Sequence, residues 1–220
     1  MRSPSERLIE TIRVRGQRVP LLDRHLARLE RSLRELGLPQ AERDLAARLR
    51  PFAHIEEGIV RIEVTDGQAA ISVRELKAPP SAVLTASTPH EPYRHKSAAR
   101  HCFDAALAEA QGAGADDALL LTRAGWVAEG STWSVFWWHG EQLCTPALEG
   151  GVLPGVARGR VSELLAPTEG TYTRAALSGH SLFLTNAVHG IVPIRSLDGV
   201  PLPEDPRTAA LAHRFWPAGE

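Results

Sequence analysis

The stretch that decides the fold class of this chain is Ile59-Val60-Arg61-Ile62-Glu63-Val64-Thr65-Asp66-Gly67-Gln68-Ala69-Ala70-Ile71-Ser72-Val73-Arg74-Glu75-Leu76. Two runs with strand-like apolar alternation, Ile59 to Thr65 and Ala69 to Leu76, flank Asp66-Gly67. An Asp-Gly pair between such runs is a strong signal for a two-residue hairpin turn. The stretch therefore predicts a pair of antiparallel strands.

Upstream of this hairpin, the sequence predicts another hairpin and two helices. Leu8 to Val14 is rich in β-branched residues, Arg15-Gly16 offers a turn, and Arg18 to Leu22 follows as a partner strand that contains a proline near one end. From Asp23, which can cap a helix, the apolar spacing becomes helical as far as Gly37. A second helix is predicted from Ala41 to Ala53, with Pro51 disturbing its last turn.

Downstream, helical and strand-like segments alternate, and several strands follow one another in hairpins. Helices are predicted at 97–111, 156–165 and 205–215, and strands at 82–86, 118–121, 126–129, 134–138, 142–145, 181–184 and 190–194. This mixture favours an α+β fold over a doubly wound parallel sheet. The proline-broken stretch after residue 88 predicts a domain boundary: a small N-terminal domain at 1–88, an interdomain loop at 89–95 and a larger C-terminal domain at 96–220.

Composition excludes several classes of protein. The formal net charge is -1 and the basic residues are spread along the chain, so no electrostatic argument supports a nucleic-acid or membrane partner. No apolar run approaches the about 20 residues that span a bilayer, and residues 1–7 lack the apolar core of a signal peptide. Two cysteines, Cys102 and Cys144, imply no disulfide framework. We expect a cytoplasmic protein.

Lysine is almost absent from this sequence. Lys77 and Lys96 are the only lysines, and the other 23 of the 25 basic residues are arginines. An amine can lose its proton and attack a carbonyl, whereas a guanidinium stays protonated. Lys96 follows a proline-broken loop near the predicted boundary, which is a common place for ligand sites. Chance survival of two surface lysines is the alternative.

Three other features are candidates for a binding site. Glycines precede a predicted helix in the run Gly150-Gly151-Val152-Leu153-Pro154-Gly155-Val156-Ala157-Arg158. The free N–H groups at the start of that helix can bind an anion. A flexible turn explains this run equally well. Glu129, between a strand end and a glycine, is either a surface carboxylate or a partner for a heterocycle nitrogen. Arg28 is either solvated or a phosphate ligand.

Other chemistries lack their signatures. The nine histidines include His90, His95 and His101, but their spacing matches no common zinc site, so we expect no metal. A nucleophile elbow, a Walker loop and a dinucleotide-binding fingerprint are all missing from the sequence.

Taken in order, these pieces resemble the class IV aminotransferase family, the fold type IV enzymes that use pyridoxal 5'-phosphate (PLP). The resemblance covers nearly the whole chain. It rests on these runs: Glu10 to Val14, Leu22 to Leu29, His95-Lys96-Ser97, Ala118 to Leu121, Glu129-Gly130-Ser131, Thr145-Pro146, Gly151 to Arg158 and Leu184 to Val188.

The resemblance implies a role for each candidate residue. Lys96 resembles the lysine that holds PLP as a Schiff base and moves protons, and Glu129 resembles the carboxylate that keeps the pyridine nitrogen protonated. Arg28, the backbone of Val156 and Ala157, and the loop of Asn186 and Ala187 resemble the phosphate-binding groups. The resemblance also implies a two-domain fold with the cofactor at the domain interface and a homodimer.

The chain departs from the family pattern in places that bear on substrate choice. The family usually has a longer segment before Glu10, with an extra strand. The aromatic residue that often precedes the Glu10 position is Ile9 here, and an asparagine common after Glu129-Gly130 corresponds to Ser134. We expect PLP binding to survive these changes.

The family contains enzymes with different reactions, and the sequence favours one of them narrowly. Asn186-Ala187-Val188 resembles the aminodeoxychorismate lyases more than the transaminases. We therefore expect a small-molecule amino substrate and release of pyruvate with 4-aminobenzoate. A branched-chain or D-amino acid aminotransferase is the alternative, and a non-catalytic member that binds the cofactor is a third possibility.

Overall fold

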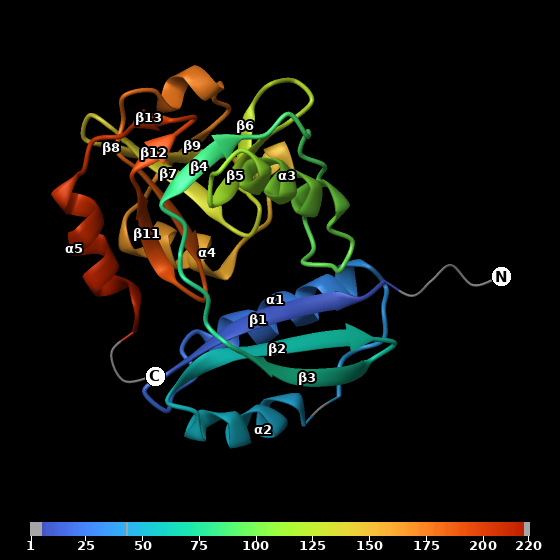
Figure 1. Cartoon of the computed structure of the whole chain (residues 1–220). Coiled ribbons are helices and arrows are strands. Elements are labelled where there is room, and N and C mark those ends of the chain that lie inside the picture. Colours follow the sequence, from blue (N-terminus) through green and yellow to red (C-terminus); the bar gives the residue numbers. More distant parts are fainter. Residues whose placement is uncertain (1–5, 43, 218–220) are drawn as a thin grey trace. The chain divides into compact units, whose positions relative to one another are not determined.

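The structure is a computed structural model that describes residues 6–42 and 44–217 (Figure 1). The chain divides into two compact units. The described residues of the first are 6–42, 44–78, 95–99 and 217; those of the second are 79–94 and 100–216. Residues 1–5, which belong to the N-terminal segment without the apolar core of a signal peptide, lie outside the described residues.

The smaller unit is built on a three-stranded antiparallel sheet in the order β1-β2-β3. Its elements are β1 (Leu8–Arg15), α1 (Leu22–Glu35), α2 (Leu45–Leu49), the 3-10 helix η1 (Arg50–His54), β2 (Glu57–Thr65) and β3 (Gln68–Arg74). The turn between β2 and β3 confirms the predicted hairpin: Asp66 and Gly67 both have positive φ, 52° and 80°, as the two-residue turn requires.

Successive side chains along each strand point to opposite sides of this sheet, so its two faces carry different residues. One face packs on the helices and forms a core of Leu8, Ile12, Val14, Val60, Ile62 and Val64 with Leu29, Leu33, Leu45 and Leu49. The opposite face carries the residues between them, including Ile9, Thr11, Arg13, Ile59, Arg61 and Glu63. The predicted amphipathic helix is confirmed as α1, and its apolar spacing reflects this core.

Three local predictions for this unit are wrong. The Arg18–Leu22 strand does not form, because Pro20 has no N–H to donate and Leu21 adopts a left-handed conformation with φ 63°; β1 pairs with β2 instead. Leu21, not Asp23, is the N-cap of α1. The helix predicted over 41–53 is reduced to α2 followed by η1, whose start contains Pro51; residue 43 lies outside the described residues.

The larger unit contains two five-stranded sheets, ordered β11-β10-β7-β8-β9 and β13-β12-β4-β5-β6. Its strands are β4 (Ala82–Thr85), β5 (Asp117–Leu121), β6 (Val127–Gly130), β7 (Ser134–His139), β8 (Gln142–Pro146), β9 (Thr168–Gly170), β10 (Leu182–Asn186), β11 (Gly190–Ile194), β12 (Ser196–Leu197) and β13 (Val200–Pro201). Its helices are α3 (His101–Gly112), η2 (Leu148–Gly150), α4 (Val156–Leu164), η3 (Arg174–Leu177) and α5 (Pro206–Phe215).

Most predicted elements of this unit are confirmed, and the mixture of antiparallel hairpins and helices is the α+β class that the sequence predicted. The exception is the start of the helix predicted at Ser97, because α3 begins only at His101. Residues 97–100 therefore belong to the connection that carries Lys96. The sequence also missed β9, β12 and β13, which have only two or three residues each.

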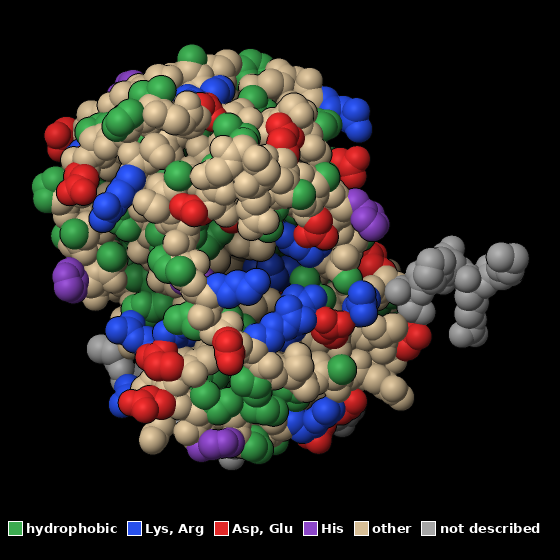
Figure 2. All heavy atoms as spheres, in the orientation of Figure 1, with side chains coloured by type: hydrophobic (Ala, Val, Ile, Leu, Met, Phe, Trp, Pro, Cys, Tyr) green, Lys and Arg blue, Asp and Glu red, His purple; other side chains and the backbone are tan. Residues whose placement is uncertain are grey.

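On the larger unit, acidic and basic side chains are interspersed over the face that Figure 2 shows. Within the described residues, no helix is long and apolar enough to cross a membrane, and no cluster of three potential metal ligands occurs.

Candidate active site

A buried cluster in the smaller unit joins β1 to α1. Glu10 of β1 accepts hydrogen bonds from Nε and Nη2 of Arg28, at 2.8 and 2.5 Å, and its Oε2 lies 2.6 Å from Nδ1 of His25. His25 and Arg28 are three residues apart and therefore share a face of α1. All three side chains are buried. The pair with Glu10 uses two of the five N–H donors of Arg28, so the guanidinium keeps three for another anion.

The charges in this cluster hold Glu10 ionised. Burial by itself would raise the pKa of Glu10, but the charges and hydrogen bonds of Arg28 and His25 outweigh it and lower this pKa to about 2. Burial also lowers the pKa of His25, against the opposing effect of Glu10. At neutral pH, Arg28 is therefore the cation that balances Glu10.

Lys96 lies on an extended segment beside the same strand. The backbone O of Lys96 accepts from the N–H of Ile9 at 2.8 Å, and the N–H of Ala98 donates to Arg7 at the same distance. The positive charge of Lys96 contributes to the lowered pKa of His25. The structure thus brings two predicted site residues, Lys96 and Arg28, to neighbouring parts of one unit. Lys96 is half-buried.

The face of the sheet opposite α1 carries an unusual arginine. Arg13 is 9% exposed and donates through Nη2 to Glu57. Its Nε and Nη1 are buried and have no hydrogen-bond partner within the described part of the chain. Arg61 lies on the same face and donates to Glu63 at 2.7 Å. A buried guanidinium with free donors favours an anionic ligand.

In the larger unit, Glu129 is a buried carboxylate at the end of β6. It is 5% exposed, which contradicts the alternative of a surface carboxylate. Its Oε1 lies 2.9 Å from Nε2 of His90 and accepts from the backbone N–H of Leu153 at 3.1 Å. Because both contacts use Oε1, Oε2 can serve a further donor.

The glycine-rich run forms the N-terminus of α4. Gly155 is its N-cap in an extended conformation, with φ -64° and ψ 141°, and Val156 and Ala157 begin the helix and are buried. A Cβ on Gly155 would lie 3.1 Å from Oγ of Ser134, so the chain passes close to this hydroxyl. The first N–H groups of a helix and its dipole favour an anion at such a place.

The guanidinium of Arg158 anchors this helix. It is buried, donates from Nη1 to the hydroxyl of Thr145 at 2.7 Å and lies 2.8 Å from Glu169. Burial lowers the pKa of Arg158, and the charge of Glu169 opposes this shift. The helix start is therefore fixed rather than a flexible turn.

The second predicted phosphate loop follows β10, against which α4 packs. Oδ1 of Asn186 accepts from the N–H groups of Val188 and His189, at 3.0 and 2.9 Å. The Asn186 side chain therefore shapes its own turn, and Ala187 is buried at the turn. Thr185, just before the turn, lies opposite Ser134 in the register of β7 and β10.

The predicted site residues thus fall into two groups, Arg28 with Lys96 in the smaller unit and Glu129, Val156, Ala157, Asn186 and Ala187 in the larger. Sequence reasoning gave no role to Glu10, His25 or His90. His25 had a usable signal, its spacing of three from Arg28 on a predicted helix. His90 had none, because its partner Glu129 is 39 residues away.

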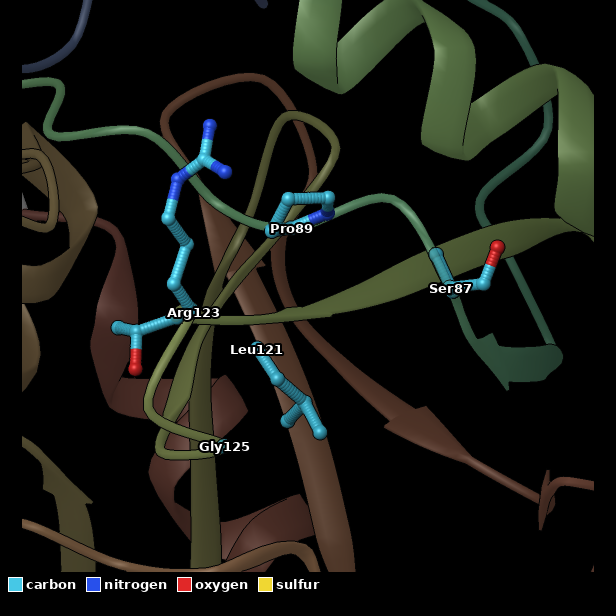
Figure 3. A pocket seen from close by; sticks show the side chains of 7 residues that line it. Ser87, Pro89, Leu121, Arg123 and Gly125 are labelled. Carbon is cyan, nitrogen blue, oxygen red and sulfur yellow. The ribbon is translucent and has the colours of Figure 1, made fainter.

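The pocket drawn in Figure 3 lies elsewhere in the larger unit. It is lined by Ala86, Ser87, Pro89, Leu121, Thr122, Arg123 and Gly125, and none of the predicted site residues lines it. We therefore place the candidate site at the buried clusters and not at this pocket.

Comparisons with known proteins agree on one family. Residues 7–197 match the model of amino-transferase class IV. An aminodeoxychorismate lyase of Bacillus subtilis is 29% identical over 82% of this chain and 73% of its own length. A probable branched-chain-amino-acid aminotransferase of Thermotoga maritima is 33% identical, but the match spans 46% of this chain and only 40% of that enzyme.

A solved structure supports the same assignment. The crystal structure of 4-amino-4-deoxychorismate lyase from Pseudomonas aeruginosa superposes with a TM-score of 0.82 at 26% identity, covering 97% of this chain and 94% of that one.

The groups described above fit the cofactor of this family, which is PLP. A lysine amine suits its aldehyde, and the buried Glu129 with a spare oxygen suits its ring nitrogen. The start of α4 and the spare donors of Arg28 suit a phosphate. From the match over residues 7–197, the chain belongs to the class IV aminotransferase family of PLP enzymes.

Proposed function

We propose that this chain is a PLP-dependent lyase that cleaves 4-amino-4-deoxychorismate into 4-aminobenzoate and pyruvate. In this proposal Lys96 binds the cofactor aldehyde, Glu129 its ring nitrogen, and Arg28, Val156, Ala157, Asn186 and Ala187 its phosphate. When bound, the cofactor serves as an electron sink for the bond that breaks.

The observation that carries the lyase assignment is the buried guanidinium of Arg13 on the face of the small sheet opposite α1. Ile9, whose N–H bonds to Lys96, is followed on that face by Thr11 and Arg13. The rise of a strand puts these about 7 and 13 Å from Ile9. Arg13 offers buried, unpaired donors there within the described residues. Such donors can bind a carboxylate of a substrate that has two carboxylates. A branched aliphatic side chain would leave them without an acceptor.

The amine of Lys96 would act as the acid–base group of this reaction. It would take the proton from the ring carbon that bears the substrate amine, while the bond to the enolpyruvyl oxygen breaks. Lys96 would return this proton to the departing enolpyruvate, which gives pyruvate, and the elimination itself leaves the aromatic ring of 4-aminobenzoate. Arg13 would hold a substrate carboxylate during these steps.

A transaminase is the second candidate. The 33% identity with the branched-chain aminotransferase favours it, as do two apolar residues, Ile9 and Ile59, on the same sheet face. In a transaminase, the same groups would pass the amine to a keto acid.

A single set of assays tests the proposal. The purified protein with PLP should show a visible absorption band, and borohydride followed by peptide mapping should find the cofactor on Lys96. Lys96→Ala should lose this adduct, whereas Lys77→Ala, the matched control, should keep it. The protein should release equimolar pyruvate and 4-aminobenzoate from 4-amino-4-deoxychorismate when no keto acid is added as cosubstrate.

The other outcomes would each overturn a different part. Transfer of the amine from leucine or D-alanine to 2-oxoglutarate, without pyruvate release from the lyase substrate, would make the chain a transaminase. A trapped cofactor with no turnover and no exchange of substrate α-hydrogen with solvent would indicate a non-catalytic member. No trapped adduct would overturn the role of Lys96.

A further inference from the structure

His90 is a side-chain partner of Glu129 in the structure. Its Nε2 lies 2.9 Å from Oε1 of Glu129, and both side chains are buried. The N–H of Leu153, in the loop that leads to α4, donates to the same oxygen. The carboxylate is therefore held by two donors on one oxygen.

The environment of the ring fixes which nitrogen carries the proton. Nδ1 of His90 is buried and has no hydrogen-bond partner in the described part of the chain. The imidazole meets Phe103 edge-on, with ring centroids 5.6 Å apart. A proton on Nδ1 would be buried without an acceptor, which costs free energy. The favoured tautomer therefore carries its proton on Nε2, which donates to Glu129.

The backbone holds His90 against the strand next to Glu129. The N–H of His90 donates to the backbone O of Leu121 at 2.7 Å, and His90 forms a bridge with Thr122. Four residues earlier, the N–H of Ala86 donates to Leu119 at 2.9 Å. Figure 3 shows part of this segment, with Ser87 and Pro89 beside β5. Since β5 pairs with β6, which carries Glu129, the imidazole has a fixed position relative to the carboxylate.

We propose that His90 is a positioning residue that turns Oε2 of Glu129 toward the pyridine nitrogen of the cofactor and stabilises the carboxylate as an anion. This inference rests on the role proposed above for Glu129. The Nε2–H group supports the carboxylate through a hydrogen bond to Oε1 and leaves Oε2 for the ring nitrogen. The guanidinium of Arg158 already interacts electrostatically with Glu129.

The test uses holoenzyme variants that differ in donor position. His90→Gln keeps an N–H near the place of Nε2, whereas the shorter amide of His90→Asn cannot reach Glu129. His90→Phe keeps the ring contact and removes the donor. His213→Phe, at an exposed position of α5, is the control.

The first readout is the 15N NMR signal of PLP labelled at its pyridine nitrogen. We expect the protonated signal in wild type, His213→Phe and His90→Gln, and a shift toward neutral pyridine in His90→Asn and His90→Phe. The kcat should fall roughly ten- to hundredfold in the last two, with a much smaller change in KM. Far-UV circular dichroism identifies any variant that fails to fold. The comparison of His90→Gln with His90→Asn then tests whether the donor to Glu129 is what matters.

The outcomes separate this inference from the proposed function. Wild-type protein with a protonated ring nitrogen and an unchanged signal in His90→Asn would overturn the role of His90 alone. A neutral ring nitrogen in the wild type, or no loss of the protonated signal in Glu129→Gln, would overturn the role of Glu129 itself.

Discussion

Glu10 and Arg28 form a two-point ion pair across the smaller unit, with Nε and Nη2 of the arginine donating to the two carboxylate oxygens. The pair joins β1 to α1 on the face of the sheet that packs on the helices. It also sets the direction of the guanidinium that we propose for phosphate binding. In this proposal, fold stability and cofactor binding depend on the same carboxylate.

Replacing this carboxylate should destabilise the unit. Glu10→Gln leaves Arg28 buried without its counterion, and we expect the free energy of unfolding to fall by about 3–5 kcal/mol. PLP affinity should fall as well, because the guanidinium loses its orientation. Urea denaturation and a PLP titration measure the two effects. Glu30→Gln, at an exposed position of α1, should change stability by less than about 0.5 kcal/mol. Equal effects of the two variants would contradict the prediction.

The same cluster should make stability depend on pH. The folded-state pKa of Glu10 is about 2, against its ordinary value of 4.5. Its contribution, about 3 kcal/mol, is fully present above pH 4.5 and is lost as pH falls toward 2. The pKa of His25 is also lowered, from 6.5, so its contribution is present above pH 6.5 and declines below it.

Denaturation curves between pH 8 and pH 3 measure this dependence. His25→Asn keeps a donor near the place of Nδ1 and cannot titrate. Its stability should therefore fall less than that of the wild type between pH 6.5 and 4.5. A variant that follows the wild-type curve through this range would show that His25 is not responsible.

The close approach of Gly155 to Ser134 makes a specific steric prediction. Gly155→Ala places a Cβ 3.1 Å from the Ser134 hydroxyl, and we expect PLP affinity to fall roughly tenfold as the helix start shifts. Adding Ser134→Ala should restore most of the affinity, because it removes the contact. Gly159→Ala meets nothing within 4 Å and should raise stability by up to about 1 kcal/mol. Independent, additive effects of the first two changes would argue against the contact.

Arg13 should determine recognition of a substrate carboxylate. Arg13→Gln should raise KM for 4-amino-4-deoxychorismate about ten- to hundredfold, because a charged hydrogen bond is lost, and should leave the visible band of bound PLP unchanged. Steady-state kinetics and absorbance measure these two effects. Arg34→Gln, exposed near the end of α1, is the matched control. An unchanged KM in Arg13→Gln would remove the main support for a dicarboxylate substrate.

The local parts of this fold were predictable from sequence because their signals lie within a few residues. Asp66 and Gly67 supply the two positive φ angles that their hairpin turn needs. The apolar face of α1 was equally clear. Arg18 to Leu22 gave a false strand signal, since composition alone does not reveal that β1 pairs with residues 57–64 instead.

The candidate site was only partly predictable for the same physical reason. Lys96 and the glycines before Val156 have distinctive chemistry and could be found one at a time. The partners that hold Glu129 and Arg28 could not, because His90 and Glu10 reach them across 39 and 18 residues. Burial of Glu129 likewise depends on tertiary packing and not on its neighbours in the chain.

The segment that carries Lys96 also affects the solubility of the fold. β1 lies at one end of the small sheet, and an uncovered edge strand is a template for pairing with other chains. Lys96 and Ala98 occupy hydrogen-bonding positions along the first part of that edge. A substitution that detaches this segment would therefore expose an edge open to aggregation, besides displacing the amine that we propose for cofactor binding.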